Sequence, residues 1–540
     1  MLLRPVLLTL LLCLASGAGA QTGLPPTDLT LTQDRLIWDG QAARFRLQPD
    51  LALPSAPASA PVIDPADTGP GAGGLRRLAA QHLASGLAGV FYDNRDRDHS
   101  SLPPDLFPQL TRLRYGPDLR AQQLDYGLAE TLLLPGPAFG NSSTAVTSGP
   151  APRSLPRLAM TTPDGPMRAW QTYAANAVYV YPEHRDHDAA DLFPGNWPYM
   201  LISQGSSGSD RPFLRAIGLI LAALPPATRE KAAADGLIAP TVQMVFRRAQ
   251  TGVRNRAAYL SGSAHPTVFA AEAIDEARMV ALAASLAPDE LPPMVLLQVL
   301  TEDFSASAGL AGQSERLYDT PSAIARVWRS PAWTREMTVT AVRTRDPNGR
   351  PLVFTWVLLR GDPDRVRITP YDARGLTARI AIDWQDAGPV SPRDPRLTSR
   401  VDIGVFASNG RQDSAPAFLS ITFPTHEARR YAPGPDGVPR LAEVDYDARG
   451  RGQKFDRLLY WSAPWRDLFR HGPDGALLGW TRVGTDSTVV EGLGAYGADG
   501  QLTEGGHVDY ILSPPRPGPT GEPTLAMRVT RKMPATPPTP

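Results

Sequence analysis

Residues 199–224, with the sequence YMLISQGSSGSDRPFLRAIGLILAAL, decide the fold of the central part of the chain. Tyr199–Ile202 is a short apolar run that predicts a buried strand, and the apolar residues of Pro212–Leu224 recur at helical spacing. A loop of small residues separates them, and Ser209 or Asp210 is well placed to cap the helix. A strand, a small-residue loop and a helix in this order predict an α/β unit.

The α/β pattern extends over residues 160–335, which we expect to form a central domain behind an N-terminal region, residues 75–159. Further runs predict two more strands and two more helices: strands Ala177–Tyr181 and Met294–Val299, and helices Ala227–Asp235 and Ile274–Leu286. Two stretches rich in Pro, Gly, Ser or Ala, residues 51–74 and 135–156, predict a linker and a loop. The linker ends an N-terminal segment that begins at residue 21.

Beyond residue 333 the sequence changes to short β runs separated by turn signals such as Asn409-Gly410. Six strands are predicted: Met337–Val342, Leu352–Leu359, Val366–Thr369, Ala378–Ile382, Val401–Ala407 and Ala417–Phe423. Their spacing predicts a β-sandwich of about 90 residues. The expected fold class is therefore multi-domain α+β, with an α/β central region followed by a sandwich.

Two segments of this β region carry a family resemblance. Residues 346–356 (DPNGRPLVFTW) resemble the opening of polycystic kidney disease (PKD) and related Ig-like domains, and residues 401–410 (VDIGVFASNG) are similar to that family's late strand and turn. The resemblance covers residues 336–424, and it departs from the family's W-x-F-G-D-G because Trp356 is followed by VLLRGD. It implies a PKD-like sandwich with a spacer or binding role in a secreted, often polymer-associated protein, and it does not imply catalysis.

The last region, residues 425–513, is predicted to be rich in β-hairpins. Tyr446–Gly450, Pro473–Leu477 and Ala498–Leu502 form a loose repeat whose glycines are 25 residues apart. It faintly resembles YD-type hairpin repeats of bacterial surface proteins, and ordinary Asp-Gly hairpin turns explain it as well. A Pro-rich tail, residues 514–540, follows.

The first twenty residues predict export. Arg4 precedes the apolar run Val6–Ala15, which is too short to span a bilayer, and Ala18-Gly19-Ala20 matches the small-residue pattern before a cleavage site. We expect a signal peptide over residues 1–20 and a secreted or periplasmic protein without a transmembrane segment in the mature chain. An uncleaved N-terminal anchor is the alternative.

Composition excludes several classes of function. The one cysteine, Cys13, lies in the expected signal peptide, so the mature chain would hold no disulfide, thiolate metal site or cysteine nucleophile. The 54 basic residues balance 54 acidic ones. A nucleic-acid partner is not expected, because its binding surface would require a basic excess.

An Arg-Asp-His sequence occurs twice, at residues 97–99 and 185–187, and each copy precedes Asp-Leu-Phe-Pro. Around the first copy, oxygen-bearing side chains alternate from Asn94 to Ser100, as calcium requires, and the second copy offers mixed nitrogen and oxygen ligands suited to a transition metal. Solvated turns with Arg–Asp pairs and a hydrogen-bonded histidine are the alternative. The candidate ligands of a divalent metal are Asp96, Asp98, His99, His184, Asp186, His187 and Asp188.

The loop between the strand and helix quoted first is a second candidate site. Free backbone N–H groups at a helix N-terminus favour anions, and the candidate residues are Gly205, Ser206, Ser207, Gly208, Ser209 and Asp210. The loop is neither a P-loop nor a G-x-S-x-G elbow. Ser206 or Ser207 is a candidate nucleophile if His187 or His265 supplies the base, and a turn that merely caps the helix is the alternative.

These observations favour an exported binding or scaffold protein that contacts an extracellular polysaccharide or an envelope protein. The alternative is a metal-dependent or serine hydrolase with its site in the α/β region, so the sequence leaves open whether the protein is an enzyme. Both hypotheses share one requirement: the separate polar loops must meet in the folded chain.

Overall fold

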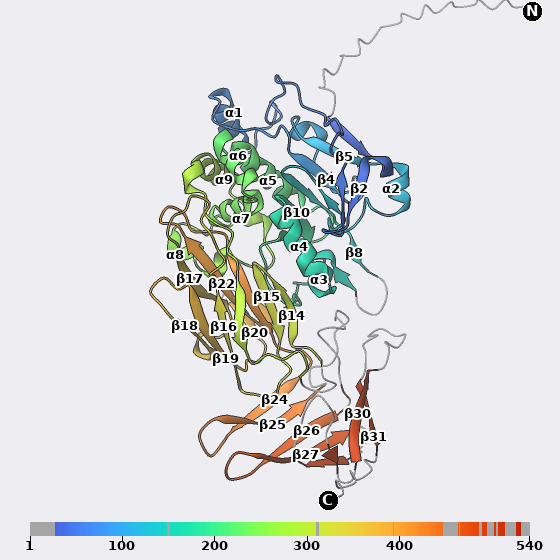
Figure 1. Cartoon of the computed structure of the whole chain (residues 1–540), viewed down its shortest axis with the longest axis vertical. Coiled ribbons are helices and arrows are strands. Elements are labelled where there is room, and N and C mark those ends of the chain that lie inside the picture. The colour runs from blue at the N-terminus through green and yellow to red at the C-terminus, as the bar shows by residue number, and fades with distance from the viewer. Residues whose placement is uncertain are drawn as a thin grey trace, which may run out of the picture.

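The computed structural model describes residues 27–147, 152–308, 313–391, 394–446, 463 and 465–484, together with the strands at 489–493, 502–503, 506–512 and 525–530. An α/β region, a pair of packed β-sheets and a long C-terminal sheet follow one another along the molecule (Figure 1). The predicted signal peptide lies outside the described residues. In the part of the chain that the structure describes, no helix is both long and apolar enough to cross a membrane.

Six parallel strands form the sheet of the α/β region, in the order β1-β5-β4-β7-β10-β12. Their bounds are β1 Asp28–Leu31, β4 Phe91–Asn94, β5 Thr111–Tyr115, β7 Ala138–Asn141, β10 Ala177–Pro182 and β12 Met200–Ser203. The predicted strands at 177–181 and 199–202 are confirmed as β10 and β12. The sheet also takes in the N-terminal segment and region, so no structural boundary falls at residue 160.

Strand order places a topological switch point between β4 and β7. The chain leaves β4 for β5 on one side, then returns to β7 on the other side of β4 and continues outward to β10 and β12. The carboxyl ends of β4 and β7 lie side by side at this point. Ligands of open α/β sheets commonly bind at the carboxyl ends of strands at a switch point.

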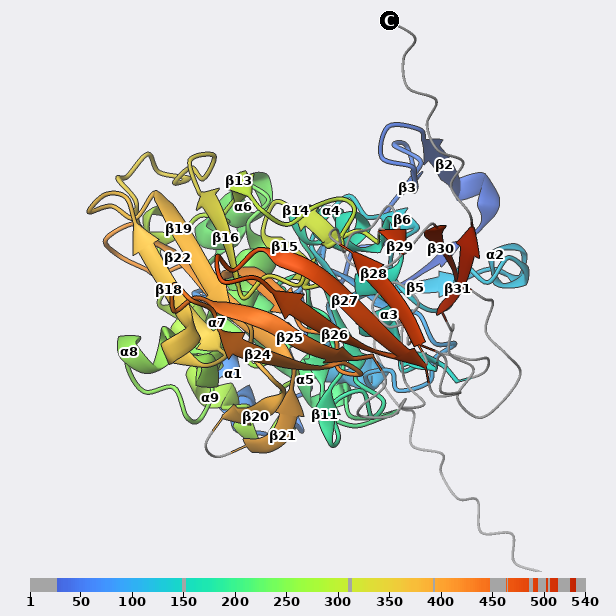
Figure 2. The ribbon, with the colours of Figure 1, turned by 90° about the horizontal axis from the view of Figure 1, so that it is seen from below.

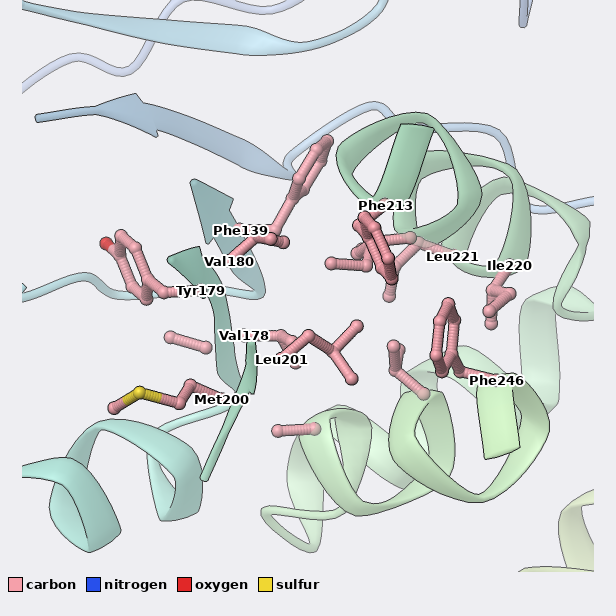
Figure 3. Packing of buried hydrophobic residues seen from close by; sticks show 14 of the residues in the cluster. Phe139, Val178, Tyr179, Val180, Met200, Leu201, Phe213, Ile220, Leu221 and Phe246 are labelled. Carbon is pink, nitrogen blue, oxygen red and sulfur yellow. The ribbon is translucent and has the colours of Figure 1, made fainter. Parts of the chain in front are cut away.

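Helices cover both faces of the parallel sheet. Their bounds are α1 Ala72–Ala80, α2 Pro117–Ala121, α3 Leu155–Thr161, α4 Gly165–Ala174, α5 Arg211–Ala223, α6 Pro226–Ala234, α7 Ile238–Arg248, α8 Arg256–Tyr259 and α9 Glu276–Ala284. Figure 3 shows Phe213 of α5 and Phe246 of α7 on the side of Val178 and Leu201, while Met200 points to the opposite side, toward α4. The predicted helices near 212–224, 227–235 and 274–286 are confirmed as α5, α6 and α9.

Two sheets with a shared apolar core make up the next region. One has the order β13-β16-β19-β18 and the other β14-β15-β23-β22-β17. Their bounds are β13 Gln298–Glu302, β14 Arg316–Thr320, β15 Ala323–Val327, β16 Thr334–Thr340, β17 Val353–Arg360, β18 Val366–Pro370, β19 Thr377–Asp383, β22 Arg400–Ser408 and β23 Ala417–Thr422. We call this unit the sandwich. All six predicted strands are present.

The sandwich begins earlier than the sequence predicts. The strand expected at 294–299 is β13, which starts at Gln298, and β13, β14 and β15 pair within the sandwich instead of joining the α/β region. The physical reason is that β13 is an edge strand with exposed Gln298, Leu300 and Thr301, so its sequence lacks the apolar pattern of a core strand.

Eight consecutive antiparallel strands form the C-terminal sheet, each paired with its neighbours in the chain (Figures 1 and 2). They are β24 Ala428–Pro433, β25 Pro439–Asp445, β26 Trp465–His471, β27 Leu477–Gly484, β28 Val489–Leu493, β29 Leu502–Thr503, β30 Gly506–Leu512 and β31 Leu525–Thr530. Gly475 of the loose repeat turns between β26 and β27 with φ +78°. Gly450 and Gly500 lie outside the described residues.

Short sheets complete the fold: β2 Leu36–Asp39, β3 Arg44–Leu47 and β6 Leu132–Leu133; β8 Ala145–Val146 and β9 Arg153–Ser154; β11 Ala190–Asp191, β20 Gly388–Ser391 and β21 Asp394–Thr398. The stretch predicted as a linker, residues 51–74, is packed on the α/β region. Ile63 is fully buried there, and the N–H of Asp64 donates to the carbonyl of Leu106 at 3.0 Å.

Candidate functional site at the carboxyl edge of the parallel sheet

Four loops leave the carboxyl ends of β4, β7, β10 and β12, and hydrogen bonds join them into one polar cluster. We call the cluster the carboxyl-edge site and define it by Asp96, His99, Asn141, Ser143, Glu183, His184 and Asp210. It lies at the switch point between β4 and β7, and the loops predicted separately from the sequence meet there.

Asp96 is the centre of the cluster. One carboxylate oxygen, Oδ2, accepts the N–H of Ser143 at 3.1 Å and the Ser143 hydroxyl, and it lies 3.2 Å from Nδ1 of His99. Within the described chain the other oxygen, Oδ1, has no hydrogen-bond partner, and the side chain is 10% exposed. Asp96 thus keeps one acceptor available at the surface.

The His99 ring is 58% exposed and presents its edge to solvent. Its Nδ1 lies 3.2 Å from Oδ2 of Asp96 and 2.7 Å from Oγ of Ser143, and a proton on Nδ1 would satisfy both contacts and leave Nε2 as an acceptor. Ser143 and Asp96 therefore both contact Nδ1 of the His99 ring. This arrangement differs from a Ser-His-Asp triad, in which the serine and the carboxylate contact opposite nitrogens.

The second Arg-Asp-His loop joins the cluster through its first histidine. Nε2 of His184 donates to the carbonyl of Ser143 at 2.6 Å, and its backbone N–H donates to the carbonyl of Gly205 at 3.0 Å. Glu183 accepts the Gly205 N–H at 3.1 Å through Oε1 and the His187 N–H at 2.9 Å through Oε2. Burial raises the pKa of Glu183.

A buried layer of amides and one carboxyl supports these loops. Nδ2 of Asn141 donates to Oδ2 of Asp210 at 2.6 Å, and Oδ1 of Asn141 accepts from Asn94 at 3.2 Å and from Tyr92 at 3.1 Å. Asp210 is fully buried, and its Oδ1 has no partner among the described residues. Burial raises the pKa of Asp210, and neighbouring Asp96 raises it further.

The sequence predicts that the side chain of Ser209 or Asp210 caps α5, and neither side chain forms such a bond. Asp210 precedes α5, but its side chain forms no capping bond because it is engaged by Asn141. The Ser209 hydroxyl lies 3.0 Å from that of Ser203. Both side chains that could cap α5 therefore serve the loop instead of the helix.

Five residues of the two Arg-Asp-His loops adopt the left-handed backbone region, which is unfavourable without glycine. They are Arg97 (φ +52°), Asp98 (+66°), Ser100 (+55°), His184 (+45°) and Arg185 (+70°). Oδ1 of Asn94 helps to hold the first loop, since it accepts the N–H groups of Asp96 and Asp98. Such conformations persist only where the surroundings fix them, and they gather at functional sites.

The proposed metal ligands take separate roles. Asp98 forms an ion pair with Arg114, Asp186 forms one with Arg157 at 2.9 Å, Nδ1 of His187 lies 3.5 Å from Asp191, and Asp188 is exposed. Over the described ranges, no three His, Asp or Glu side chains are placed to hold a metal ion together. Metal binding by these residues therefore remains a prediction.

Among the described residues, no hydrogen bond joins Ser206 or Ser207 to either histidine proposed as their base, His187 or His265. Ser206 and Ser207 are exposed in the loop before α5. His265 is buried between Tyr259 and Phe406, its Nε2 donates to the Tyr259 carbonyl, and burial holds its pKa well below the usual range. The anion-binding role of Gly205–Asp210 remains a prediction, and the buried Asp210 carboxyl within the loop opposes it.

Three residues of the cluster were not recognised from the sequence: Asn141, Ser143 and Glu183. The first two fall in the stretch predicted as a loop, residues 135–156, where β7 is short and contains Gly140. A small polar run directly after an apolar pair, Ala138-Phe139, was the available signal. Glu183 follows β10 directly, as expected for a residue at the carboxyl edge of a strand.

No protein-family model matches this chain, and no curated protein is similar to it. Among solved structures, a nucleoside hydrolase-related hypothetical protein from Saccharophagus degradans, associated with carbohydrate metabolism, is 11% identical over 54% of this chain and 72% of its own, with a TM-score of 0.19. The N-terminal Ig1-2 module of the Drosophila receptor protein tyrosine phosphatase DLAR is 9% identical over 38% of this chain and 96% of its own, with a TM-score of 0.13. Likenesses this weak carry no argument about function.

Proposed function

We propose that this chain is an exported binding protein whose carboxyl-edge site holds a segment of an extracellular or envelope polysaccharide. The observation that carries the proposal is the direct hydrogen bonding of loops from four strands at the switch point of a parallel sheet. The signal peptide expected over residues 1–20 supports export of the protein. In this proposal the β-sheet regions support the α/β region that carries the site.

The free groups of the site favour a ligand rich in hydroxyls. Oδ1 of Asp96 has no hydrogen-bond partner among the described residues, and the His99 side chain is 58% exposed, so a sugar hydroxyl can bond to either group. Exposed Ser206 and Ser207 add hydroxyls at the rim of the same loops. The contacts that hold both Arg-Asp-His loops in left-handed conformations also keep these groups in fixed positions, which lowers the entropic cost of binding a ligand.

We also propose that the sandwich is an Ig-like, PKD-like module. Labelled in chain order with β14 and β15 set apart, the strands give one sheet ordered A-B-E-D from β13, β16, β19 and β18, and a second containing G-F-C from β23, β22 and β17. The same order is the one that Ig-like sandwiches use. A spacer or presentation role beside a polymer-binding site is consistent with such a module.

Retention on insoluble polymers tests the binding proposal. The full chain is incubated with peptidoglycan, cellulose, chitin and envelope extract, and Asp96→Asn is compared with Asp362→Asn, which removes an exposed carboxylate of the sandwich. We expect at least one polysaccharide to retain the wild type and the Asp362→Asn control but not Asp96→Asn. Equal retention of all three, or none on any polymer, refutes the proposal, and retention on protein components alone points to an envelope protein instead.

A second candidate, hydrolysis of the same polymer, is favoured by the two carboxyls of the site. Asp210 is buried with a raised pKa, and Asp96 is held as a hydrogen-bonded acceptor with one free oxygen. Two carboxyls in such different environments are the usual basis for an acid and a base in one site. Release of reducing ends that is lost in both Asp96→Asn and Asp210→Asn would establish it, and intact polymer after long incubation would exclude it.

A further inference from the structure

The segment that leaves the carboxyl-edge site runs directly onto the sandwich. Residues 190–191 form β11, which pairs in parallel with β21, and β21 forms a hairpin with β20 (Figure 2). Further along, the N–H of Asn196 donates to the Ser420 hydroxyl at 2.9 Å, and the Thr422 hydroxyl donates to the carbonyl of Pro194 at 2.7 Å. A Cβ on Gly195 would overlap the Tyr318 hydroxyl, so the backbone of Gly195 packs closely against a side chain of β14.

A buried cluster of charges fixes the end of this segment. Asp191 is fully buried, and it pairs with Arg400 at 2.9 Å and with Arg360, both on sandwich strands. Asp402 completes the cluster through two contacts of 2.8 and 2.9 Å with Arg400. We call Asp191, Arg360, Arg400 and Asp402 the junction cluster. Two carboxylates and two guanidiniums balance one another, so removal of one member leaves a buried charge uncompensated.

The junction cluster is connected to the site within one short loop. His187 Nδ1 lies 3.5 Å from Asp191, and the His187 N–H donates to Glu183, which also binds the N–H of Gly205. The carbonyl of His187 accepts from Arg396 of β21 at 3.2 Å, and the N–H of Leu397 donates to Ala189 at 3.1 Å. Loop 183–191 is thus held by the α/β region at its start and by the sandwich at its end.

The backbone of this loop needs support from both sides. His184 and Arg185 adopt left-handed conformations, each of which costs on the order of 1 kcal/mol without glycine. A loop released at one end would relax toward ordinary backbone angles, and His184 would then lose its position against Ser143. The contacts at Asp191 and Arg396 oppose that relaxation.

We infer that the sandwich is a positioning element of the carboxyl-edge site: it sets the conformation of loop 183–191 through the junction cluster and the β20–β21 hairpin. This inference rests on the site assigned under the proposed function. It adds that the sandwich controls the geometry of the site as well as supporting it. Asp191 and Arg396 are the positioning residues, since each acts on the site through His187 without reaching the ligand.

Amide hydrogen exchange of the full chain tests the inference. In Asp191→Asn we expect exchange at residues 183–191 and 205–209 to accelerate on the order of tenfold, with the interiors of α5 and α7 unchanged. Arg396→Ala removes the bond to the His187 carbonyl and the ion pair with Asp394 inside the hairpin, both at a partly exposed side chain. The variant is therefore expected to remain folded and to accelerate the same peptides by about threefold. The matched control is Arg379→Ala, which deletes an exposed ion pair with Glu336 elsewhere in the sandwich.

Local acceleration in Arg396→Ala but not in the control supports the inference, and it decides the matter if Asp191→Asn does not fold. Unchanged exchange over 183–191, or a uniform rise that includes α5 and α7, overturns it. Exchange needs no ligand, so its result is independent of polymer retention, and a negative retention experiment leaves this test intact.

Discussion

Replacement of Asp210 by asparagine is expected to stabilise the protein at neutral pH. Asp210 is fully buried, its Oδ2 accepts from Asn141, and its Oδ1 has no partner in the described chain. Burial raises its pKa, which means that folding favours the protonated carboxyl. The folded state therefore loses stability as pH rises from the carboxyl's ordinary pKa toward its raised pKa in the folded chain.

The magnitude follows from two opposing effects. A buried polar group without a partner costs about 1–3 kcal/mol, and a charged group costs more. Asparagine keeps the bond to Asn141 and replaces the unpaired charged oxygen with an unpaired neutral amide, which lowers this cost. Loss of a carboxylate near the N-terminus of α5 costs about 0.3–1 kcal/mol. We expect Asp210→Asn to raise the free energy of unfolding by about 1 kcal/mol at pH 7.

Urea unfolding of wild type and Asp210→Asn at pH 7 and at pH 3 measures this difference. The gain is expected at pH 7 and absent at pH 3, where the wild-type carboxyl is protonated in both states. Asp210→Ala is the control, because it strands Asn141 and is expected to be destabilising at both pH values. Asp210→Asn that is as destabilised as Asp210→Ala at pH 7 would refute the reasoning, because it would show that the ionised carboxylate has a stabilising partner.

Three further results are expected. Gly140→Ala places a Cβ far inside contact distance of the Asp93 carbonyl on β4, so it is expected to cost about 3 kcal/mol in urea unfolding. A Cβ on Gly388 meets only the Asp386 carbonyl at 4.0 Å, so Gly388→Ala is expected to change stability by less than about 0.5 kcal/mol. Burial alone would raise the pKa of Asp191, but Arg400 and Arg360 hold this pKa well below its usual range. The Asp191 carboxylate therefore stabilises the fold above about pH 4, and this stabilisation is lost as pH falls further. Asp191→Asn is expected to be destabilised by about 3–5 kcal/mol at pH 7, and this deficit should shrink only in the acid range. Phe213→Ala opens a void between α5 and the sheet and is expected to cost about 3–5 kcal/mol, seen as a lower midpoint in thermal unfolding.

Strands with strong apolar runs were predictable from the sequence, and those shaped by close packing were not. β10 and β12 consist of consecutive buried residues, and their sequences predicted them. β7 was missed because Gly140 makes its sequence resemble a loop. That glycine is required because the backbone of β4 passes where a side chain would stand, and only the folded chain shows this approach.

The sequence predicts which loops form the candidate site, but it does not predict which side chains pair with one another there. The two Arg-Asp-His copies marked the carboxyl edge, since each follows an aromatic strand. The sequence makes Asp186 a candidate metal ligand, but in the fold Asp186 pairs with Arg157 of α3. Ser143 was overlooked because its role depends on Asp96, which is 47 residues away in the chain. Residue types indicated the chemistry, and only the fold could assign the pairs.

The interlocking of the sandwich with its neighbour bears on how such a protein can evolve. A β-sandwich can pass between genes as an intact unit only if its strands begin and end within one stretch of the chain. Here β13, β14 and β15 precede the predicted boundary, and β21 pairs with a strand from the α/β region. A gene fragment cut at residue 335 would leave strands with unpaired edges on both pieces, a liability for aggregation. The two regions are therefore expected to be inherited together.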